Sequence, residues 1–361
     1  MKKIDEKEWK TFPAFSDNGL FHIATTSSSI DAVRLKDGEN KSVPYVTRTD
    51  VSNGIARFVS AENYDFGSDD GECITVGLDT QTAFYQPHRF VTGQNVHVVT
   101  GRQLSEEVSI FLVTILREQM QAKFNWGGNG ATLGRMKRLL VMLPVDDDGK
   151  PDYDYMAQYA SEMRGGMLMR YRSYVAEQLS KLEYKDIPAL DEKEWREFHL
   201  EEIGTVTSGR DIYAAERIEG DTPYITSGGT NNGVGYFVGN SNETLDSGYI
   251  ALNRNGAVGK AFYHSSKSLM GNDCRKVHLK NADNNLFVGQ FVALCISMQS
   301  ECFSYSRKLG TARAKRMQIM LPVTGFGKPD YDYMEQYTKN MMIRKYKQYL
   351  TFADRAENKK Q

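Results

Sequence analysis

Cysteine and histidine are scarce in this sequence of 361 residues, and neither follows a metal-binding pattern. The four cysteines, Cys73, Cys274, Cys295 and Cys302, lack the paired spacing of zinc ligands. The six histidines are scattered without ligand spacing. The sequence therefore predicts no metal site and no cofactor, and it predicts thiols that stay reduced in a cytoplasmic protein.

Long apolar runs and a strong net charge are absent as well. No stretch approaches the roughly 20 apolar residues of a membrane helix, and residues 1–6 lack the apolar core of a signal peptide. We therefore expect a cytoplasmic protein with no membrane partner. The formal net charge is only -1, so binding to a polyanion such as nucleic acid would have to rest on local basic patches.

One eight-residue sequence, Gly-Lys-Pro-Asp-Tyr-Asp-Tyr-Met, occurs twice, at residues 149–156 and 327–334. Each copy follows Leu-Pro-Val and precedes a long stretch of helical pattern. Such self-similarity indicates a tandem duplication. We interpret each copy as a strand-to-helix joint, with Pro151 at an early helical position and Asp152 favourable to the helix dipole. A docking surface for a partner is the alternative.

The duplication predicts four segments. Residues 1–148 and 186–326 form two domains, and residues 149–185 and 327–361 form the helix that follows each domain. Each domain is long enough to bury its own core. Short β-prone runs broken by Gly, Asn and Asp alternate with helical patterns, which predicts an α/β (α+β) fold of short mixed strands and helices.

Matching elements are predicted in the two domains. Trp-x-x-Phe at residues 9–12 and 195–198 marks a short strand with two aromatic anchors. Asn-Gly at residues 53–54 and 232–233 stands between β-prone runs, which is a hairpin signal because both residues tolerate positive φ. Further along, a helix is predicted in each domain, at residues 108–123 after the capping Ser105 to Glu107 and at 286–299 after Asn285.

The two long helices, expected at about residues 157–183 and 335–357, each carry a stripe of Met and Tyr. The stripes predict packing of the helices against each other as an antiparallel, coiled-coil-like spacer, in preference to a cofactor site. A helix of about 28 residues would span about 42 Å. The packing candidates are Met156, Tyr159, Met163, Met167 and Tyr174 in the first helix, and Met334, Tyr337, Met341 and Tyr349 in the second.

Each domain also contains a basic cluster at the same place, after a glycine-bearing loop. Such clusters bind DNA phosphates, and a solvated surface is the alternative. The recurrence in both domains favours phosphate binding. The residues are Arg135, Lys137 and Arg138 in the first domain, and Arg307, Lys308, Arg313, Lys315 and Arg316 in the second.

Polar side chains in the loops are candidates for contacts with base edges, since Arg recognises guanine and Asn or Gln recognises adenine. For the Asn-Gly pairs, turn formation is at least as good an explanation. The candidates are Arg48, Thr49, Asn53, Gln81, His88, Arg89 and Asn129 in the first domain, and Ser227, Asn231, Asn232, Arg254, Asn255 and Lys260 in the second.

Enzymatic motifs are incomplete. Residues 256–260 resemble part of a phosphate-binding loop, but position 254 is Arg where that motif needs Gly, and neither Ser nor Thr follows Lys260. Pro151-Asp152 and the Glu-Tyr-Lys of residues 183–185 imitate a nuclease signature, but a long helix separates them. No methyltransferase motif and no Gly-x-Ser-x-Gly motif occurs. The sequence predicts no catalytic residue.

Four motifs in this order resemble the target-recognition domains of DNA specificity subunits, which belong to Type I and Type IIB restriction-modification systems. They are Trp-x-x-Phe, residues 223–237, the Arg-Asn-Gly-Ala-Val-Gly-Lys of residues 254–260, and residues 319–323. The resemblance covers the whole chain twice. It is weaker in the first domain, where residues 48–51 read Arg-Thr-Asp-Val.

The resemblance implies a non-catalytic subunit. Two recognition domains would each read half of a bipartite, asymmetric DNA target, and the helices would set the gap between the halves. The implied partners are double-stranded DNA and DNA methyltransferase subunits, and a nuclease subunit fused or joined to them stays open. Two alternatives also remain: a helical scaffold that assembles partners without DNA, and a stand-alone nuclease.

Overall fold

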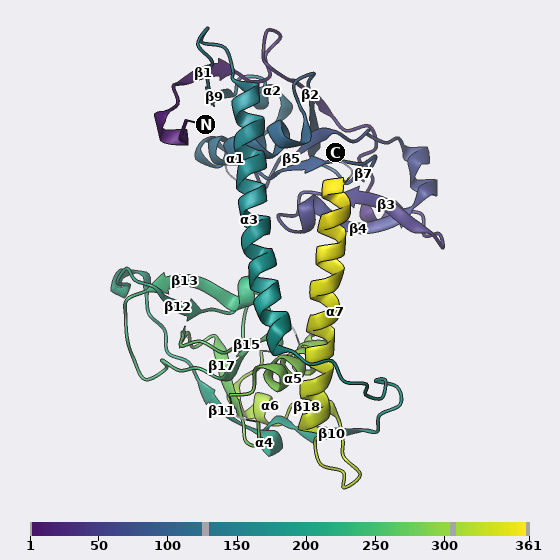
Figure 1. Ribbon diagram of the computed structural model, residues 1–361, viewed down its shortest axis with the longest axis vertical. Coiled ribbons are helices and arrows are strands. Elements are labelled where there is room, and N and C mark those ends of the chain that lie inside the picture. The colour runs from purple at the N-terminus through teal and green to yellow at the C-terminus, as the bar shows by residue number, and fades with distance from the viewer. Residues whose placement is uncertain (1, 125–129, 283, 304–307, 359–361) are drawn as a thin grey trace. The chain divides into compact units, whose positions relative to one another are not determined.

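The computed structural model describes residues 2–124, 130–282, 284–303 and 308–358. The chain forms two compact units, Met1–Tyr171 and Arg172–Gln361. Both units contain the same succession of strands, with the helix α4 (Leu200–Ile203) added between the first two strands of the second unit (Figure 1). The mixed α/β fold in tandem is therefore confirmed.

In the first unit, the described strands are β1 (Trp9–Pro13), β2 (His22–Thr25), β3 (Lys41–Val46), β4 (Ile55–Ser60), β5 (Cys73–Gly77), β6 (Ala83–Gln86), β7 (Val91–Thr92), β8 (Val96–Thr100) and β9 (Leu140–Pro144). They form an antiparallel sheet in the order β2-β8-β5-β6, a sheet in the order β4-β3-β7 and the antiparallel pair β1-β9. Strands β3 and β4 are antiparallel, whereas β3 and β7 are parallel.

The second unit repeats this topology. Its described strands are β10 (Trp195–His199), β11 (Gly204–Ser208), β12 (Thr222–Ile225), β13 (Val234–Val238), β14 (Tyr249–Asn253), β15 (Ala261–His264), β16 (Leu269–Met270), β17 (Cys274–Leu279) and β18 (Gln318–Pro322). The sheets have the orders β11-β17-β14-β15, β13-β12-β16 and β10-β18. The Trp-x-x-Phe strands are thus confirmed as β1 and β10, each paired with the strand that ends in Leu-Pro.

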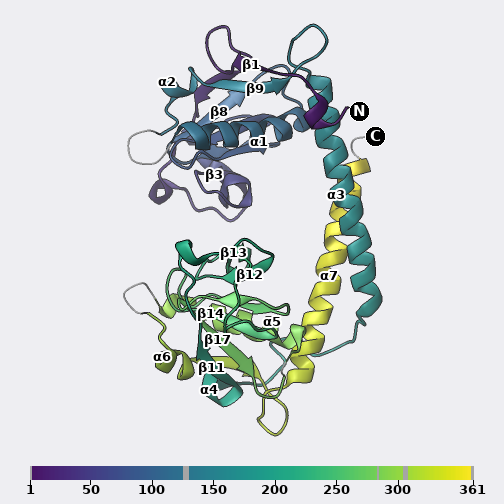
Figure 2. The same ribbon diagram turned by 90° about the vertical axis from the view of Figure 1, so that its left-hand side faces the viewer.

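The helix predicted in each unit is present, and it covers the four-stranded sheet. Helix α1 (Glu106–Lys123) lies against β5 and β6, and α5 (Leu286–Met298) lies against β14 and β15 (Figure 2). The side chains of Ser105 and Asn285 cap these helices by accepting hydrogen bonds from backbone N–H groups of the first turn. The remaining short helices are α2 (Leu133–Met136), α4 (Leu200–Ile203) and α6 (Thr311–Lys315).

The repeated eight-residue sequence begins a long helix in each unit, α3 (Tyr153–Lys181) and α7 (Tyr331–Asn358). Asp152 accepts a hydrogen bond from the backbone of Tyr155 at 2.9 Å and forms an ion pair with Lys7 at 2.6 Å. In the second unit, Asp330 binds the Tyr333 backbone and Lys193 in the same way, at 3.1 and 2.8 Å. The aspartate therefore caps the helix and ties it to the segment before β1 or β10.

The expected position of Pro151 inside the helix is wrong. Pro151 forms a bridge with Val145 before α3 begins, and Pro329 does the same with Val323 before α7. The N-terminal cap position belongs to the following aspartate, whose carboxylate can bind the free N–H groups of the first turn.

The first turns of α3 and α7 pack on their own units. Met156 is fully buried in the core of the first unit, and Met334 is fully buried in the core of the second. Tyr159 packs edge-on against Phe111, with ring centres 5.8 Å apart, and Tyr337 packs against Phe291 in the same geometry at 5.7 Å. These four candidates therefore anchor each helix to its own domain, and not to the other helix as expected.

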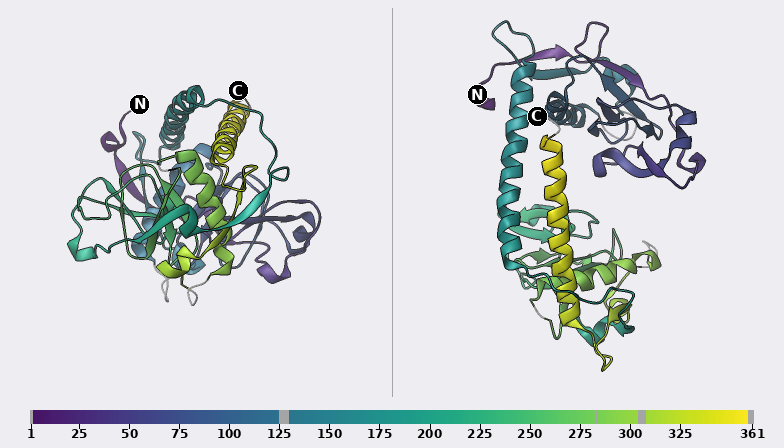
Figure 3. Two further views of the ribbon diagram at one scale, coloured as in Figure 1. Left: turned by 90° about the horizontal axis from the view of Figure 1, so that it is seen from below. Right: turned by 45° about the vertical axis from the view of Figure 1, so that its right-hand side comes forward.

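The end of α3 lies beside α7 within the second unit (Figure 3). Arg172 forms an ion pair with Asp354, and the Tyr174 ring packs edge-on against Tyr346 with centres 6.3 Å apart. Beyond α3, the backbone carbonyl of Glu183 accepts a hydrogen bond from Gln336 at 2.9 Å. Residue numbers rise from 172 to 183 along the α3 side while those of the contacted α7 residues fall from 354 to 336. This part of the predicted antiparallel pair is therefore confirmed.

The other stripe residues differ in exposure. Met163 and Met167 of α3 are 46% and 53% exposed, Tyr349 of α7 is 46% exposed and Met341 is half-buried.

Among the described residues, no helix is long and apolar enough to cross a membrane.

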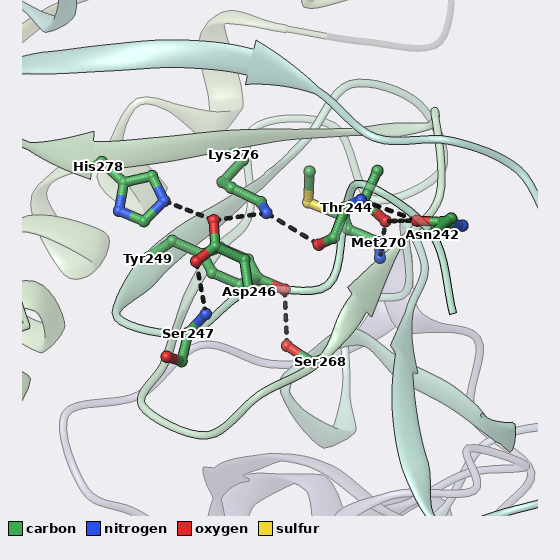
Figure 4. A network of polar contacts seen from close by, with 9 residues as sticks. All are labelled: Asn242, Thr244, Asp246, Ser247, Tyr249, Ser268, Met270, Lys276 and His278. Carbon is green, nitrogen blue, oxygen red and sulfur yellow. Dashed lines mark hydrogen bonds and ion pairs between the residues drawn. The ribbon is translucent and has the colours of Figure 1, made fainter. Parts of the chain in front are cut away.

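A buried polar network is specific to the second unit (Figure 4). The Lys276 ammonium group donates hydrogen bonds to Asp246 at 2.8 Å and to the Thr244 carbonyl at 2.9 Å, and it lies over the Tyr249 ring. The His278 imidazole lies 2.9 Å from the same Asp246 oxygen. In the first unit Val98 takes the place of Lys276 and packs in an apolar cluster.

A second difference between the units is the buried residue that ends β6 and β15. Gln86 donates hydrogen bonds to the Asn53 carbonyl at 2.9 Å and to Thr75 at 3.1 Å. His264 stands at the equivalent position, opposite Tyr249, and its buried Nε2 has no hydrogen-bond partner within the described chain. Burial lowers the pKa of His264 to about 4.

The His264 pKa predicts a loss of stability in mild acid. Below pH 6.5 the unfolded chain binds a proton at this histidine that the folded chain resists until about pH 4, so folding weakens as the pH falls through this window. We expect the free energy of unfolding to fall by about 2 kcal/mol less in His264→Gln, which copies Gln86, than in the parent protein between pH 7 and 4.5. Denaturant titrations at both pH values measure this. Equal losses in the two proteins would contradict the prediction.

Candidate nucleic-acid interface

Three loops meet at one edge of the first unit. Residues 47–54 connect β3 to β4, residues 78–82 connect β5 to β6, and residues 130–136 include α2. The Leu78 N–H donates to the Asn95 carbonyl at 3.0 Å, and the Ala131 N–H donates to the Leu78 carbonyl at 2.9 Å. These bonds, and the ion pair between Arg48 and Asp79, hold the loops together with Asn95. We call the three loops and Asn95 the loop cluster of the first unit.

The second unit has a loop cluster built by the same bonds. The Arg254 N–H donates to the Asp273 carbonyl at 2.8 Å, and the Leu309 N–H donates to the Arg254 carbonyl at 3.2 Å. Arg254 therefore occupies the place of Leu78, and Asp273 the place of Asn95. Loop 254–260 is longer than loop 78–82, and its Ala257 N–H donates to the Ser227 carbonyl at 3.0 Å.

The Asn-Gly pairs shape the loops between β3 and β4 and between β12 and β13. The predicted hairpins are confirmed, because both strand pairs are antiparallel. Each turn has three consecutive residues at positive φ, Ser52 to Gly54 and Asn231 to Gly233. Asn53 also donates its side-chain amide to the Tyr85 carbonyl at 2.8 Å. Turn formation thus accounts for Asn53, while Asn231 and Asn232 are exposed.

The candidate base-contact residues of the first cluster differ in availability. Arg48 is half-buried and forms an ion pair with Asp79. Thr49 is half-buried, with its backbone N–H bonded to Thr47. Gln81 is 8% exposed, and its amide donates to the carbonyls of its own loop at residues 78 and 79. The structure therefore uses the Gln81 side chain to hold the loop.

In the second cluster, Arg254 and Asn255 follow β14 directly. The Arg254 guanidinium donates to the Asn272 carbonyl at 3.4 Å, and Asn255 donates its amide to the Asp273 carboxylate. Both side chains are half-buried, as is Ser227, whereas Lys260 is exposed. The loop that contains Arg254 and Asn255 contacts the start of the β12–β13 loop, through Ala257 and Ser227 and through Asn253 and the Gly228 carbonyl.

His88 and Arg89 lie apart from the loop cluster of the first unit. Both are exposed and precede β7. Arg89 donates to Ser68 at 2.8 Å, and its guanidinium lies 4.3 Å from the centre of the Tyr64 ring. This cation–π contact places Arg89 over the 3-10 helix Ala61–Phe66.

The basic clusters surround two short helices, α2 and α6. Arg135 donates to the Gly130 carbonyl at 3.0 Å, and Arg313 donates in the same manner to the Lys308 carbonyl. Lys137, Arg138, Lys308, Arg313, Lys315 and Arg316 are exposed, and Arg135 is half-buried. The predicted Asn129 and Arg307 lie outside the described residues.

Arg313 and Arg316 line a hollow of about 510 Å³ on the second unit. Its other walls include Glu197, Gln299 and Met320. An open hollow with two guanidinium groups suits an anionic backbone, because arginine presents several N–H donors in a fixed geometry.

Three polar residues of the clusters were absent from the sequence-based candidates: Asp79, Asn95 and Asp273. They become visible only when the shared hydrogen bonds align the two units, because the loops between them differ in length.

Among the described residues, no three His, Cys, Asp or Glu side chains are grouped as metal ligands. Burial raises the pKa of the Cys73, Cys274 and Cys295 thiols to about 12.

Comparison with known proteins finds relatives along the whole chain. The Type I restriction modification DNA specificity domain matches residues 6–164 and again residues 192–350. The BcgI specificity subunit, S.BcgI, of a Type II restriction enzyme from Heyndrickxia coagulans is 28% identical over 330 residues, which cover 91% of this chain and 94% of that subunit.

Among solved structures, the S subunit of a Type I restriction-modification system from M. genitalium is 16% identical, with a TM-score of 0.48, covering 97% of this chain and 93% of that one. The HsdS subunit from Thermoanaerobacter tengcongensis is 12% identical, with a TM-score of 0.32, covering 87% and 85%. The two domain matches together span well over half of the sequence. The chain therefore belongs to the Type I restriction-modification DNA specificity family, whose domain it contains twice.

Proposed function

We propose that this chain is the DNA specificity subunit of a restriction-modification complex and recognises a bipartite, asymmetric double-stranded target. The observation that carries the proposal is the pair of specificity domains with equivalent loop clusters and different side chains in them. The same framework with different hydrogen-bonding groups suits two half-sites of different sequence.

The exposed cations around α2 and α6 are proposed to bind phosphates, and the loop clusters are proposed to reach base edges. Arg48, Arg254, Asn231 and Asn232 are the base-contact residues that the geometry favours most, and Asn255 would have to give up its bond to Asp273 to reach a base. Thr49, Ser227 and Lys260 lie in the same loops. His88 and Arg89 would contact DNA from a separate edge.

The subunit is proposed to have no catalytic residues of its own and to position DNA methyltransferase subunits, with a nuclease subunit as a further partner. The duplicated helices α3 and α7 would separate residues 1–148 from 186–326 and set the gap between half-sites. We propose a cytoplasmic location for the complex, in keeping with action on DNA. A helical scaffold without DNA affinity is the alternative, and the family match disfavours it.

The salt dependence of duplex binding tests the role of α6. Each neutralised phosphate contact lowers the slope of log affinity against log salt concentration by about 1. We expect Arg313→Gln with Lys315→Gln to lower the slope of the complex by about 2, and to weaken binding about equally on different sequences. The measurement is a titration of labelled duplex from about 50 to 200 mM salt.

Lys328→Gln serves as the matched control, because Lys328 is exposed in the turn before α7, away from α6. Its slope should equal that of the parent protein. An unchanged slope in the double variant would remove α6 from the phosphate contacts, and the absence of duplex binding by the parent complex would contradict the proposed function.

A further inference from the structure

Aligned by their hydrogen bonds, the two loop clusters contain the same pair of side chains in exchanged order. Leu78 and Arg254 are equivalent, so the residues that follow them, Asp79 and Asn255, are equivalent as well. Asn95 and Asp273 are also equivalent, because their carbonyl groups accept from Leu78 and Arg254. The first unit therefore pairs Asp79 with Asn95, and the second pairs Asn255 with Asp273.

Each pair is a direct hydrogen bond between carboxylate and carboxamide. Asn95 donates its amide to Asp79 at 3.3 Å, and Asn255 donates its amide to Asp273. Two carboxylates at this distance would repel each other, whereas one carboxylate and one amide satisfy each other. The exchange keeps the bond and moves the negative charge from the β5–β6 loop to the residue before β17.

The position of the aspartate in each pair decides which arginine side chain lies near its carboxylate. In the first unit, Asp79 also forms an ion pair with Arg48, whose side chain is 42% exposed beside an aspartate that is 22% exposed. In the second unit the position of Arg48 is Ser227, and the arginine instead precedes the pair, as Arg254. The guanidinium of Arg254 is bonded to Asn272, the neighbour of Asp273.

We propose that Asp79 is a positioning residue that fixes Arg48 for contact with a base, and that the exchanged Asp–Asn pairs make the two units read different base pairs. The inference rests on the proposed function. Arginine in a fixed orientation can bind the O6 and N7 atoms of guanine with two hydrogen bonds. A carboxylate that accepts from the other side of the guanidinium restricts its rotation and its loss of entropy on binding.

The test is selection of duplexes from a random library by the full chain in complex with its methyltransferase. The variants are Asp79→Asn, Arg48→Lys and the exchange Asp79→Asn with Asn95→Asp. The matched control in the second unit is Asn255→Asp with Asp273→Asn. Melting temperatures accompany each selection.

Asp79→Asn is expected to lower the preference at one base pair of one half-site by about 10-fold and to leave the other half-site unchanged. Arg48→Lys should lower the preference at that same base pair. The first exchange variant should melt close to the parent, because the side-chain pair is kept, yet retain the altered preference. The control exchange should alter only the other half-site.

Several results would overturn the inference. They are an unchanged preference in Asp79→Asn, a change at different base pairs in Asp79→Asn and Arg48→Lys, or full recovery of the preference in the exchange variant. The last result would make the pair purely structural. A parent complex that selects no sequence at all would instead contradict the proposed function.

Discussion

Asp246→Asn is expected to lower the free energy of unfolding of the second unit by about 3 kcal/mol. Asp246 is the carboxylate partner of Lys276, whose side chain is only 6% exposed. Removing one member of a buried ion pair leaves the other charge without compensation, which typically costs about 3–5 kcal/mol. We take the lower end because Asp246 is itself 38% exposed. Equilibrium denaturation at neutral pH measures the loss.

The control for this prediction is Lys276→Met. An apolar side chain fits here because Val98 occupies the equivalent position of the first unit among apolar neighbours. Asp246 would keep its bonds to His278 and to the Ser247 backbone. We expect a loss below about 1 kcal/mol. Equal losses in the two variants would contradict the interpretation that the uncompensated lysine charge causes the effect.

The same network predicts a dependence on acid. Burial opposes ionisation of Asp246, but hydrogen bonds from Lys276 and His278 outweigh it and lower its pKa to about 2, against the usual 3.8. A lowered pKa stabilises the folded state above pH 3.8, and that contribution is lost as the pH falls towards 2. Asp246→Asn should lack this part of the acid transition.

Phe291→Ala is expected to cost the second unit about 3–5 kcal/mol, the usual range for a large aromatic side chain in a core. The Phe291 ring stacks on Trp195, with centres 6.2 Å apart, and meets the edge of Tyr337 at 5.7 Å. It thereby joins β10, α5 and the first turns of α7. Denaturation should show the loss, and hydrogen exchange should show faster opening of the first turns of α7.

The duplication supplies a matched variant. Phe111 packs against Trp9 and Tyr159 at 6.3 and 5.8 Å, so Phe111→Ala should destabilise the first unit by a similar amount. Phe291→Leu keeps most of the apolar volume and should cost less than about 1.5 kcal/mol. A loss below 1 kcal/mol in Phe291→Ala would show that the aromatic contacts do not anchor the helix.

The sequence predicted the elements whose signals are local. The repeated eight residues predicted a long helix after each copy, although the helices begin within the repeat, at Tyr153 and Tyr331, and not at residues 157 and 335. Trp-x-x-Phe located β1 and β10. The pairing of β2 with β8, and of β11 with β17, has no local signal, because it joins segments far apart in the chain. Met156 and Met334 fit a helix stripe equally well whether the helix packs on its own domain or on its counterpart, so periodicity alone could not choose.

The candidate interface was predictable by residue type but not by contact. Gln and Asn commonly contact bases, and Gln81 and Asn53 were candidates for that reason. In the structure both residues have a positive φ within a turn, and both donate their side-chain amides to backbone carbonyl groups. Asp79, Asn95 and Asp273 show no motif. Asn95 is equivalent to Asp273, and Asp79 to Asn255, because the backbone hydrogen bonds around them match. The loops between these positions differ in length, so a comparison of the two amino-acid sequences alone does not reveal the equivalence.

Sequencing of methylated DNA from cells that contain this chain with its methyltransferase tests the central claim most directly. The account predicts methylation within one sequence of two different halves separated by a fixed gap, and loss of that pattern when the chain is removed. Methylation that shows no bipartite preference, or a pattern that persists without the chain, would contradict it.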